Sequence, residues 1–267
     1  MNRALFVRTW RAQRLKLVIA SVAIAAWSTF LPVIYKSFGS QMKALVDSGV
    51  IPKQLTDFGG GDVFSLSGSI AIGFIHPIAI ILVAIFAVGF ATSAVAGERQ
   101  RGTLEVILAR PVSRRGLYVT LLVGAWFFIA VVEAAALAGT IIGSSLAGVF
   151  GELEVSRLPL LWINGTLFWG TIAAVGLAAS VTFDRLGPAL GITLAIVVVS
   201  YFLEILGSLW PDAKGLQPYS LFHYLAPRDV LNGAASVGGF AILAVVAVVA
   251  VVWALVEFPR RDLAAPS

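Results

Sequence analysis

The stretch GERQRGTLEVILARPVSRRG, residues 97–116, is the densest cluster of charge in a chain of 267 residues that is otherwise mostly apolar. Two long hydrophobic runs, residues 69–95 and 117–148, flank it. Each run is long enough to cross a bilayer as a helix, because a hydrocarbon core about 30 Å thick needs about 20 apolar residues. The stretch is therefore predicted to form a short polar loop at a membrane surface, held there by two spans.

The composition places the whole chain in a membrane. Hydrophobic residues make up 59% of it and charged residues 12%, and the mean hydropathy is +0.94. A soluble fold of this length cannot bury so much apolar surface. The chain has no cysteine, which excludes disulfides, thiolate metal sites and thiol nucleophiles. The net charge of +5 is better explained by basic cytoplasmic loops than by nucleic-acid binding.

Six apolar stretches are long enough to span a bilayer, and they define the predicted fold. They run approximately over residues 17–35, 69–95, 117–148, 159–182, 188–210 and 237–257. Unbroken apolar runs favour helices, because the strands of a membrane barrel alternate apolar and polar residues. The segments between the runs are too short for a second domain. Residues 1–267 are therefore predicted to form a single all-α transmembrane domain.

The distribution of Lys and Arg predicts the orientation. The loops on one side, together with both termini, carry 13 of these residues, and the opposite loops carry 6. By the positive-inside rule the richer set faces the cytoplasm, so both termini are expected there. Residues 1–16 mix basic with aromatic side chains and lack a signal-peptide cleavage site. We expect them to form an interfacial helix at the inner surface, or else a basic flank that only sets the orientation.

Two outer segments are expected to carry structure of their own. Within residues 36–68, the amphipathic pattern from Gln41 to Leu55 predicts a short outside helix. The segment 210–238, between the fifth and sixth spans, is broken into pieces by three prolines and contains the apolar run 221–225. We expect this segment to dip into the outer leaflet as a re-entrant piece or to lie on it. Packing on its own spans is the alternative.

The first half of the central loop predicts the start of a new helix. Gly97 and Gly102 loosen the chain at the inner end of the second span. Thr103 is a suitable N-cap for a helix that follows. Glu105 would then lie in the first turn, where the helix dipole favours a carboxylate.

This helix is predicted to be amphipathic and about two turns long. Leu104, Ile107 and Leu108 share one face by their spacing. Pro111 would end the helix, and Ser113 would cap the third span. Because apolar side chains supply much of the contact energy at an interface, the ridge is expected to contact a partner, with the charged flanks fixing its orientation.

The order and spacing of residues 97–115 resemble the first cytoplasmic loop of ABC transporter permeases of the type-two exporter family. That loop reads as Glu-Arg, Gly-Thr-Leu-Glu, a few apolar residues and then Pro-Val-Ser-Arg. The six spans, the basic N-terminal segment and the ending Phe258–Leu263 are similar to the family as well. The resemblance implies a coupling helix over residues 103–109 that sits in a groove of a separate cytoplasmic ATPase. It also implies two ATPase copies and two permease chains, identical or homologous.

The resemblance assigns specific residues to these roles. ATPase coupling would involve Glu98, Arg99, Arg101, Gly102, Thr103, Leu104, Glu105, Ile107, Leu108, Pro111, Ser113 and Arg114, and a second inner loop would contain Asp184 and Arg185. The sequence lacks the Gly-x-x-x-x-Gly-Lys-Ser/Thr loop that cradles nucleotide phosphates. The chain is therefore not expected to be an enzyme or to hold a cofactor, and the partner ATPase would bind ATP and Mg²⁺.

Three ionisable residues fall inside the predicted spans: His76, Glu133 and Glu204. A rise of about 1.5 Å per residue places all three in the outer half of the membrane. Because charge in lipid is costly, such residues usually face a polar interior. They are candidates for a vestibule that contacts substrate, for hydrogen bonding between helices, or for a divalent metal site. The dipeptide His76-Pro77 also predicts a kink.

The function predicted from these features is that of a permease subunit of an ATP-driven exporter. It would couple ATP hydrolysis by the partner to export of a hydrophobic or amphipathic substrate through the inner membrane of a prokaryote. One alternative is an ATP-independent six-span transporter, channel or scaffold. Another is a permease-like subunit that senses or signals. The expected partners are the ATPase, a second permease chain and the lipid bilayer, and no nucleic acid.

Overall fold

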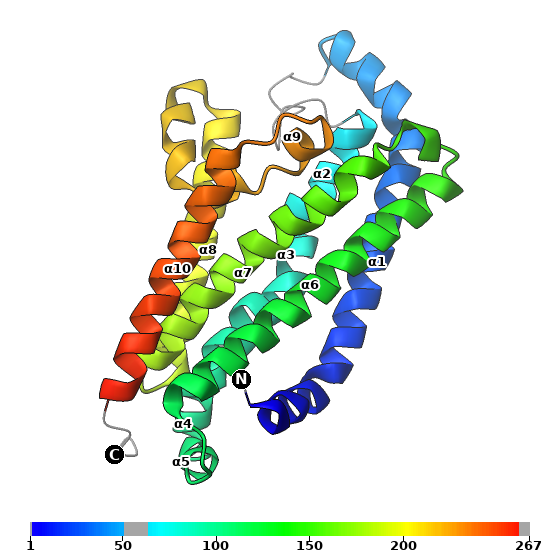
Figure 1. Ribbon diagram of the computed structural model, residues 1–267. Coiled ribbons are helices and arrows are strands. Elements are labelled where there is room, and N and C mark those ends of the chain that lie inside the picture. Colours follow the sequence, from blue (N-terminus) through cyan, green and yellow to red (C-terminus); the bar gives the residue numbers. More distant parts are fainter. Residues whose placement is uncertain (1, 51–63, 262–267) are drawn as a thin grey trace.

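The computed structural model describes residues 2–50 and 64–261, and every regular element in these two ranges is helical. Five long helices run alongside one another (Figure 1): α1 (Arg3–Asp47), α6 (Arg114–Leu146), α7 (Leu158–Thr182), α8 (Leu186–Leu209) and α10 (Val237–Arg260). Each contains a stretch long and apolar enough to cross a membrane, and a bent helix pair, residues 66–75 with 77–90, supplies a sixth candidate. The prediction of an all-helical fold is confirmed for the described residues, and five or six candidate spans are found where six were predicted.

The second span is not one straight helix. It consists of α2 (Leu66–Ile75), α3 (Pro77–Ala84) and two wide π-helical segments, η2 (Ile85–Phe90) and η3 (Ser93–Gly97). The chain bends by 45° between α2 and α3. The cause is Pro77, which has no backbone N–H to continue the ladder, so that His76 takes an extended conformation between the two helices. The kink predicted from His76-Pro77 is therefore confirmed.

A side chain from another helix satisfies the backbone of the wide segment η3. The amides of Val95 and Ala96 donate to the hydroxyl oxygen of Ser180 on α7, at 3.0 and 2.9 Å. The same hydroxyl donates to the carbonyl of Thr92 at 2.6 Å. A π-type turn disturbs the usual i to i−4 ladder, and a buried amide without a partner would be costly. Ser180 thus supplies hydrogen-bond partners that the irregular backbone of η3 would otherwise lack.

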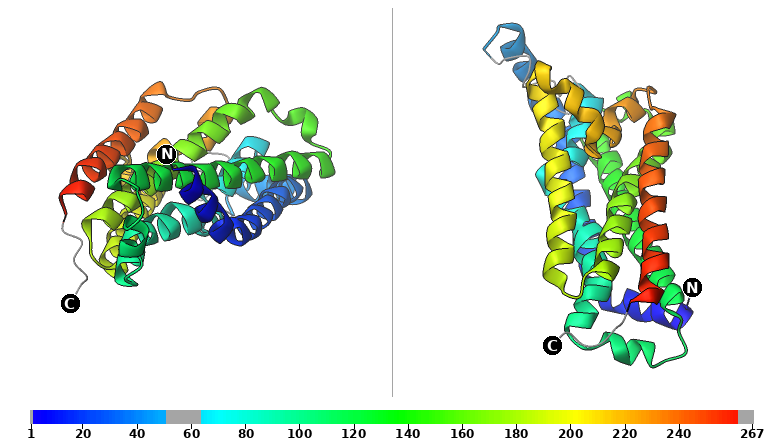
Figure 2. Two further views of the ribbon diagram at one scale, coloured as in Figure 1. Left: turned by 60° about the horizontal axis from the view of Figure 1, so that its bottom comes forward. Right: turned by 90° about the vertical axis from the view of Figure 1, so that its left-hand side faces the viewer.

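The first helix is longer than predicted at its C-terminal end. Residues 41–47 continue α1 without a break. The helix ends at Asp47, and Gly49, two residues later, has a φ of +78°, which suits glycine. The prediction of a separate outside helix is wrong for these residues, because nothing before Gly49 forces the chain out of the helical conformation. Residues 51–55 lie outside the described ranges. At the other end, the first turns of α1 lie across the bundle (Figures 1 and 2), at the same end of the molecule as the C-terminus.

Helices α1 and α6 cross with their backbones in close contact. A Cβ atom added to Gly139 would lie 2.2 Å from the carbonyl oxygen of Ala25, and one added to Gly143 would lie 2.2 Å from that of Thr29. Both distances are shorter than the 3.0 Å that Cβ contacts in proteins normally keep. The Thr29 hydroxyl lies within hydrogen-bond distance of the Gly139 carbonyl, at 3.1 Å. Small residues four apart allow this backbone approach, as in membrane helix pairs generally.

The segment between α8 and α10 forms a cap at the end opposite the termini (Figure 1). It contains η6 (Pro211–Tyr219), η7 (Phe222–Tyr224) and α9 (Pro227–Leu231), and the short turns η4 (Phe150–Glu152) and η5 (Val155–Arg157) precede α7. Phe222 and Val230 are buried in the core, and the Asn164 amide of α7 donates to the Tyr224 carbonyl at 3.0 Å. The predicted alternative, packing on its own helices, is therefore observed, and the position of the segment relative to the outer leaflet stays a prediction.

Candidate functional site

The central loop begins with a tight turn at the end of α4 (Glu98–Gln100). The amide of Gly102 donates to the carbonyl of Arg99, and the amide of Thr103 donates to that of Glu98, each at 2.9 Å. This pair of bonds is a Schellman motif, which needs a residue with positive φ, and Gly102 has a φ of +68°. Thr103 holds the predicted N-cap position of α5, but it makes no side-chain hydrogen bond to the amides of that helix. Its backbone is helical, and its hydroxyl lies 2.6 Å from the Glu98 carboxylate instead of capping α5.

Charge stabilises the same turn. The Arg101 guanidinium forms an ion pair with Glu98 at 2.7 Å. Partial burial alone would raise the pKa of the Glu98 carboxyl. Hydrogen bonds from Thr103 and Arg101, with the positive charges of Arg101 and Arg8, outweigh that effect and hold the pKa below its ordinary value. The carboxylate is therefore ionised at neutral pH and ties the N-terminal segment electrostatically to the loop.

The short helix α5 (Leu104–Leu108) turns its apolar ridge toward the protein itself. Leu104 is only 2% exposed, and Ile107 and Leu108 are half-buried against the core. Val106 on the other side is 66% exposed. This burial corrects the expectation of a partner contact for Leu104, because spacing defines an apolar face but not what covers it; for Ile107 and Leu108 the contact stays a prediction. Glu105 lies in the first turn, as predicted.

A groove lies between α5 and the first turns of α1. Its volume is about 530 Å³. It is lined by Asn2, Ala4, Leu5 and Arg8 on one side and by Thr103, Val106, Ile107, Arg110, Pro111 and Val112 on the other. Sequence reasoning did not single out Leu5, Arg8 or Val106. The mixture of basic and apolar residues over 1–16 was the available signal, but it did not indicate that this segment faces the loop.

The exit of the loop is anchored to the far end of the chain. Ser113 caps α6 by accepting from the Gly116 amide at 3.0 Å, as predicted. The guanidinium of Arg114 donates to the carbonyls of Phe258 and Pro259, each at 3.2 Å, and to that of Arg261 at 2.6 Å. These are terminal carbonyls of α10 and the residue after it, which have few partners within the helix. Arg114 thus ties α6 to α10.

Asp184, in the loop between α7 and α8, joins three parts of the chain. It pairs with Arg99 of α4 at 2.8 Å and with Arg261 after α10 at 2.5 Å. Arg99 is 9% exposed, and Arg261 also donates to the Val181 carbonyl at 2.9 Å. Arg185 is exposed. The central loop and the second inner loop are thus brought together, and Arg261 is a residue of this site that the sequence did not single out.

Replacing Asp184 with Ala is expected to loosen this junction. Arg99 would stay largely buried without its carboxylate partner, while the half-exposed Asp184 limits the loss through solvent screening. Loss of an ion pair costs little at an exposed site and several kcal/mol at a buried one. For this partly buried pair, the expected loss of unfolding free energy is about 1–3 kcal/mol. Thermal unfolding in detergent measures it. Asp212→Ala, which removes an exposed carboxylate at the opposite end, is the control, and equal unfolding temperatures for the two variants would contradict the prediction.

The three intramembrane residues have different neighbours. His76 caps α3 by accepting from the Ile78 amide at 3.3 Å, and its ring packs on Trp27 with centroids 4.7 Å apart. Glu133 is 2% exposed and lies against Gly165, where a Cβ would overlap its carboxylate. Glu204 lines a cavity at the capped end.

These neighbours bear on the alternatives for the three residues. Within the described ranges, no group of three or more His, Cys, Asp or Glu side chains could hold a metal ion, so the metal arrangement is not supported. His76 fits the structural role. Only Glu204 of the three lines one of the described cavities.

Comparison with protein families matches residues 11–263 to a model described as ABC-2 family transporter protein. The match includes most of α1 and all the helices that follow it. No curated protein matches the chain.

Proposed function

The chain belongs to the ABC-2 family of transporter proteins, and on this premise we propose that it is the permease subunit of an ATP-driven exporter. The family consists of transmembrane subunits that work with an ABC ATPase. In our proposal two ATPase copies bind ATP and Mg²⁺, and two permease chains, identical or homologous, pair in the inner membrane of a prokaryote. The end that holds both termini faces the cytoplasm. The substrate is hydrophobic or amphipathic.

The observation that carries the proposal is the position of α5. It lies at the end of the bundle with both termini (Figure 2), packed on the core through Leu104 and exposed at Val106. A helix that docks on a partner must be exposed to that partner and must also pack rigidly on its own protein. A flexible loop would change its own conformation instead of passing the partner's movement on to the spans. We assign the ATPase contact to the exposed side of α5 and the groove beside it. The crosswise first turns of α1 would lie at the inner membrane surface.

The ionic junction offers a route for coupling. A displacement of α5 and α4 acts on Asp184 through Arg99, and from Asp184 on α10 through Arg261. Arg114 connects α10 to α6. ATP-dependent closure of the ATPase would therefore bias the relative positions of several spans at once. Such a bias requires that the ATPase dimer bind the two arrangements with different affinity.

The test is co-purification followed by transport. The tagged chain is expressed with an ABC ATPase encoded beside it, and the complex is placed in proteoliposomes that contain a lipophilic fluorescent substrate. We expect the ATPase to co-purify and transport to need ATP. A variant of the ATPase lacking its P-loop Lys controls for ATP-independent leakage. Absence of the ATPase from the purified complex would favour an ATP-independent membrane protein, and a stable complex without transport would favour a sensing subunit.

A further inference from the structure

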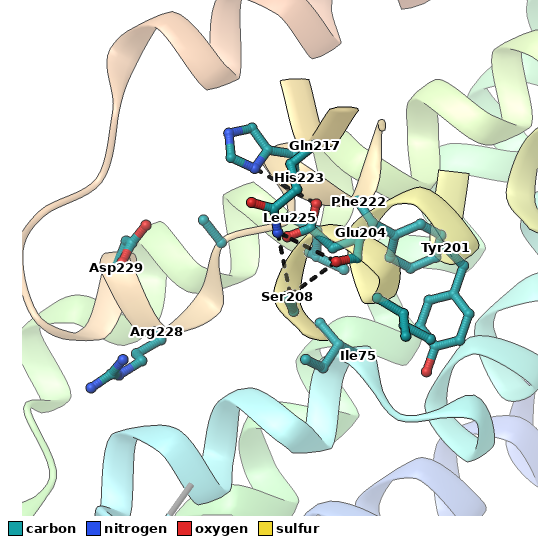
Figure 3. Close-up of a pocket in the computed structure, with 12 residues that line it drawn as sticks. Ile75, Tyr201, Glu204, Ser208, Gln217, Phe222, His223, Leu225, Arg228 and Asp229 are labelled. Atoms are coloured by element: carbon teal, nitrogen blue, oxygen red, sulfur yellow. Dashed lines mark hydrogen bonds and ion pairs between the residues drawn. The ribbon is translucent and has the colours of Figure 1, made fainter. Parts of the chain in front are cut away.

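The capped end of the bundle contains a small cavity, lined by both apolar and polar side chains, that lies away from the loop assigned to the ATPase. Its volume is about 160 Å³, and α8 and the cap segment supply most of its lining (Figure 3). The side chains that matter for its chemistry are Tyr201, Glu204, Ser208, Gln217, Phe222 and His223. Drug-sized ligands occupy pockets of about 300–1,000 Å³. This cavity is therefore suited to a small polar group rather than to a whole large substrate.

The carboxylate of Glu204 is held in place by its neighbours. The Gln217 amide lies 3.1 Å from Glu204 Oε1 and 3.2 Å from the Ser208 hydroxyl. Gln217 can lie this close to α8 because position 207 is a glycine, where any Cβ would overlap the Gln217 side chain. The orientation of Glu204 is thus fixed by packing before any ligand arrives, which lowers the cost of binding.

The second carboxylate oxygen is left without a hydrogen bond. Glu204 Oε2 is shielded from solvent and makes no hydrogen bond to any described residue. The nearest charged or ionisable partner is Nδ1 of His223, at 3.6 Å, which is beyond hydrogen-bond distance. A ligand can reach this oxygen only when the His223 side chain, which is 41% exposed, turns away from it. A buried acceptor that lacks a donor is costly, and a donor or a cation that takes the place of His223 removes that cost. The geometry thus favours a positively charged ligand.

The rest of the lining agrees with this preference. Two carboxylates, Glu204 and Asp229, and one guanidinium, Arg228, give a formal charge of −1 when His223 is neutral. Figure 3 shows the Arg228 guanidinium directed away from the Glu204 cluster. Tyr201 and Phe222 add aromatic rings to the lining. Aromatic faces and a carboxylate together are the usual surroundings of an organic ammonium group.

We propose that this cavity binds an ammonium group, either of a free small amine or of an amine-bearing lipid headgroup. Only the role of the ligand, as part of the substrate or as a bound lipid, rests on the proposed transport function. Binding itself is a property of this chain alone. It can therefore be measured without the ATPase, so that a failure of one proposal does not imply a failure of the other.

The free-amine arm uses the purified chain in detergent, titrated calorimetrically with choline. The comparison ligand is the neutral isostere of choline in which carbon replaces the nitrogen. Glu204→Gln preserves shape and an oxygen for Gln217, and it is expected to weaken choline binding about tenfold or more while leaving the isostere unchanged. Glu154→Gln, an exposed charge removal at the same end, is the matched control. Unfolding temperatures confirm that each variant is folded.

The lipid arm uses native mass spectrometry of the protein taken from nanodiscs. One set contains phosphatidylglycerol only, and the other also contains phosphatidylethanolamine. Retention of phosphatidylethanolamine by the wild type but not by Glu204→Gln assigns the site to a lipid headgroup, and selective choline binding assigns it to a free amine. Equal binding of choline and its isostere by the wild type, with no lipid difference between wild type and variant, overturns the proposal. That comparison of ligands needs no variant.

Discussion

Replacing Gly139 or Gly143 with Ala is expected to destabilise the protein by about 1–3 kcal/mol for each site, and by more for the double variant. Each added methyl group would overlap a backbone carbonyl of α1, at Ala25 or Thr29. A backbone cannot move aside as a flexible side chain can, so α1 and α6 must separate. Separation would also remove the contact between the Thr29 hydroxyl and the Gly139 carbonyl.

Thermal unfolding in detergent, followed by size-exclusion chromatography, measures this effect. The matched control is Gly191→Ala on α8, where an added Cβ meets nothing within 4 Å. That change should be neutral or slightly stabilising, because Ala favours a helix by about 0.5–1 kcal/mol over Gly. The α1–α6 crossing would not be the tight contact described here if the three variants unfolded at the same temperature.

Val106→Asp is expected to abolish recovery of the ATPase partner while leaving the chain folded in the membrane. Val106 is 66% exposed on α5 and lines the groove, so a charge there costs little in the isolated chain. In a docked complex it would replace an apolar contact with a buried charge. Loss of a central interface residue costs about 2 kcal/mol or more, which is about a 30-fold weaker complex. Co-purification of the ATPase measures it.

Two further substitutions separate docking from folding. Leu104→Asp places a charge at a position 2% exposed and should lower the unfolding temperature of the chain itself. Val155→Asp makes the same change as Val106→Asp at a residue 45% exposed near the opposite end, and should leave ATPase recovery unchanged. Unaltered recovery with Val106→Asp would show that the partner does not bind this side of α5.

The long-range pattern of hydropathy predicted the spans because each must be apolar for about 20 residues regardless of its neighbours. The break at His76-Pro77 and the cap at Ser113 were predictable for a related reason: both depend on the backbone chemistry of one or two adjacent residues. The end of α1 was missed because amphipathicity alone does not place a helix terminus.

The junction at Asp184 could not be read from the sequence in the same way. Its partners, Arg99 and Arg261, are 85 and 77 residues away, and nothing local to any of the three specifies the pairing. The direction of the apolar face of α5 was missed for a related reason, since a face of Leu and Ile side chains packs equally well on its own protein or on another. Small residues such as Gly143 allow helices to approach closely, but the helix that approaches here, α1, emerged only from the fold.

The hydroxyl of Ser180 has a mechanical consequence. Because it completes the backbone hydrogen bonds of η3, the inner part of the second span cannot slide along α7 without leaving the amides of Val95 and Ala96 unbonded in an apolar environment. The segment η3 and the helix α7 are therefore held together by these hydrogen bonds and are expected to move as one rigid unit. In the proposed coupling, the bend at His76 is the point where the second span would change its angle, and a displacement that begins at the loop would move α7 as well.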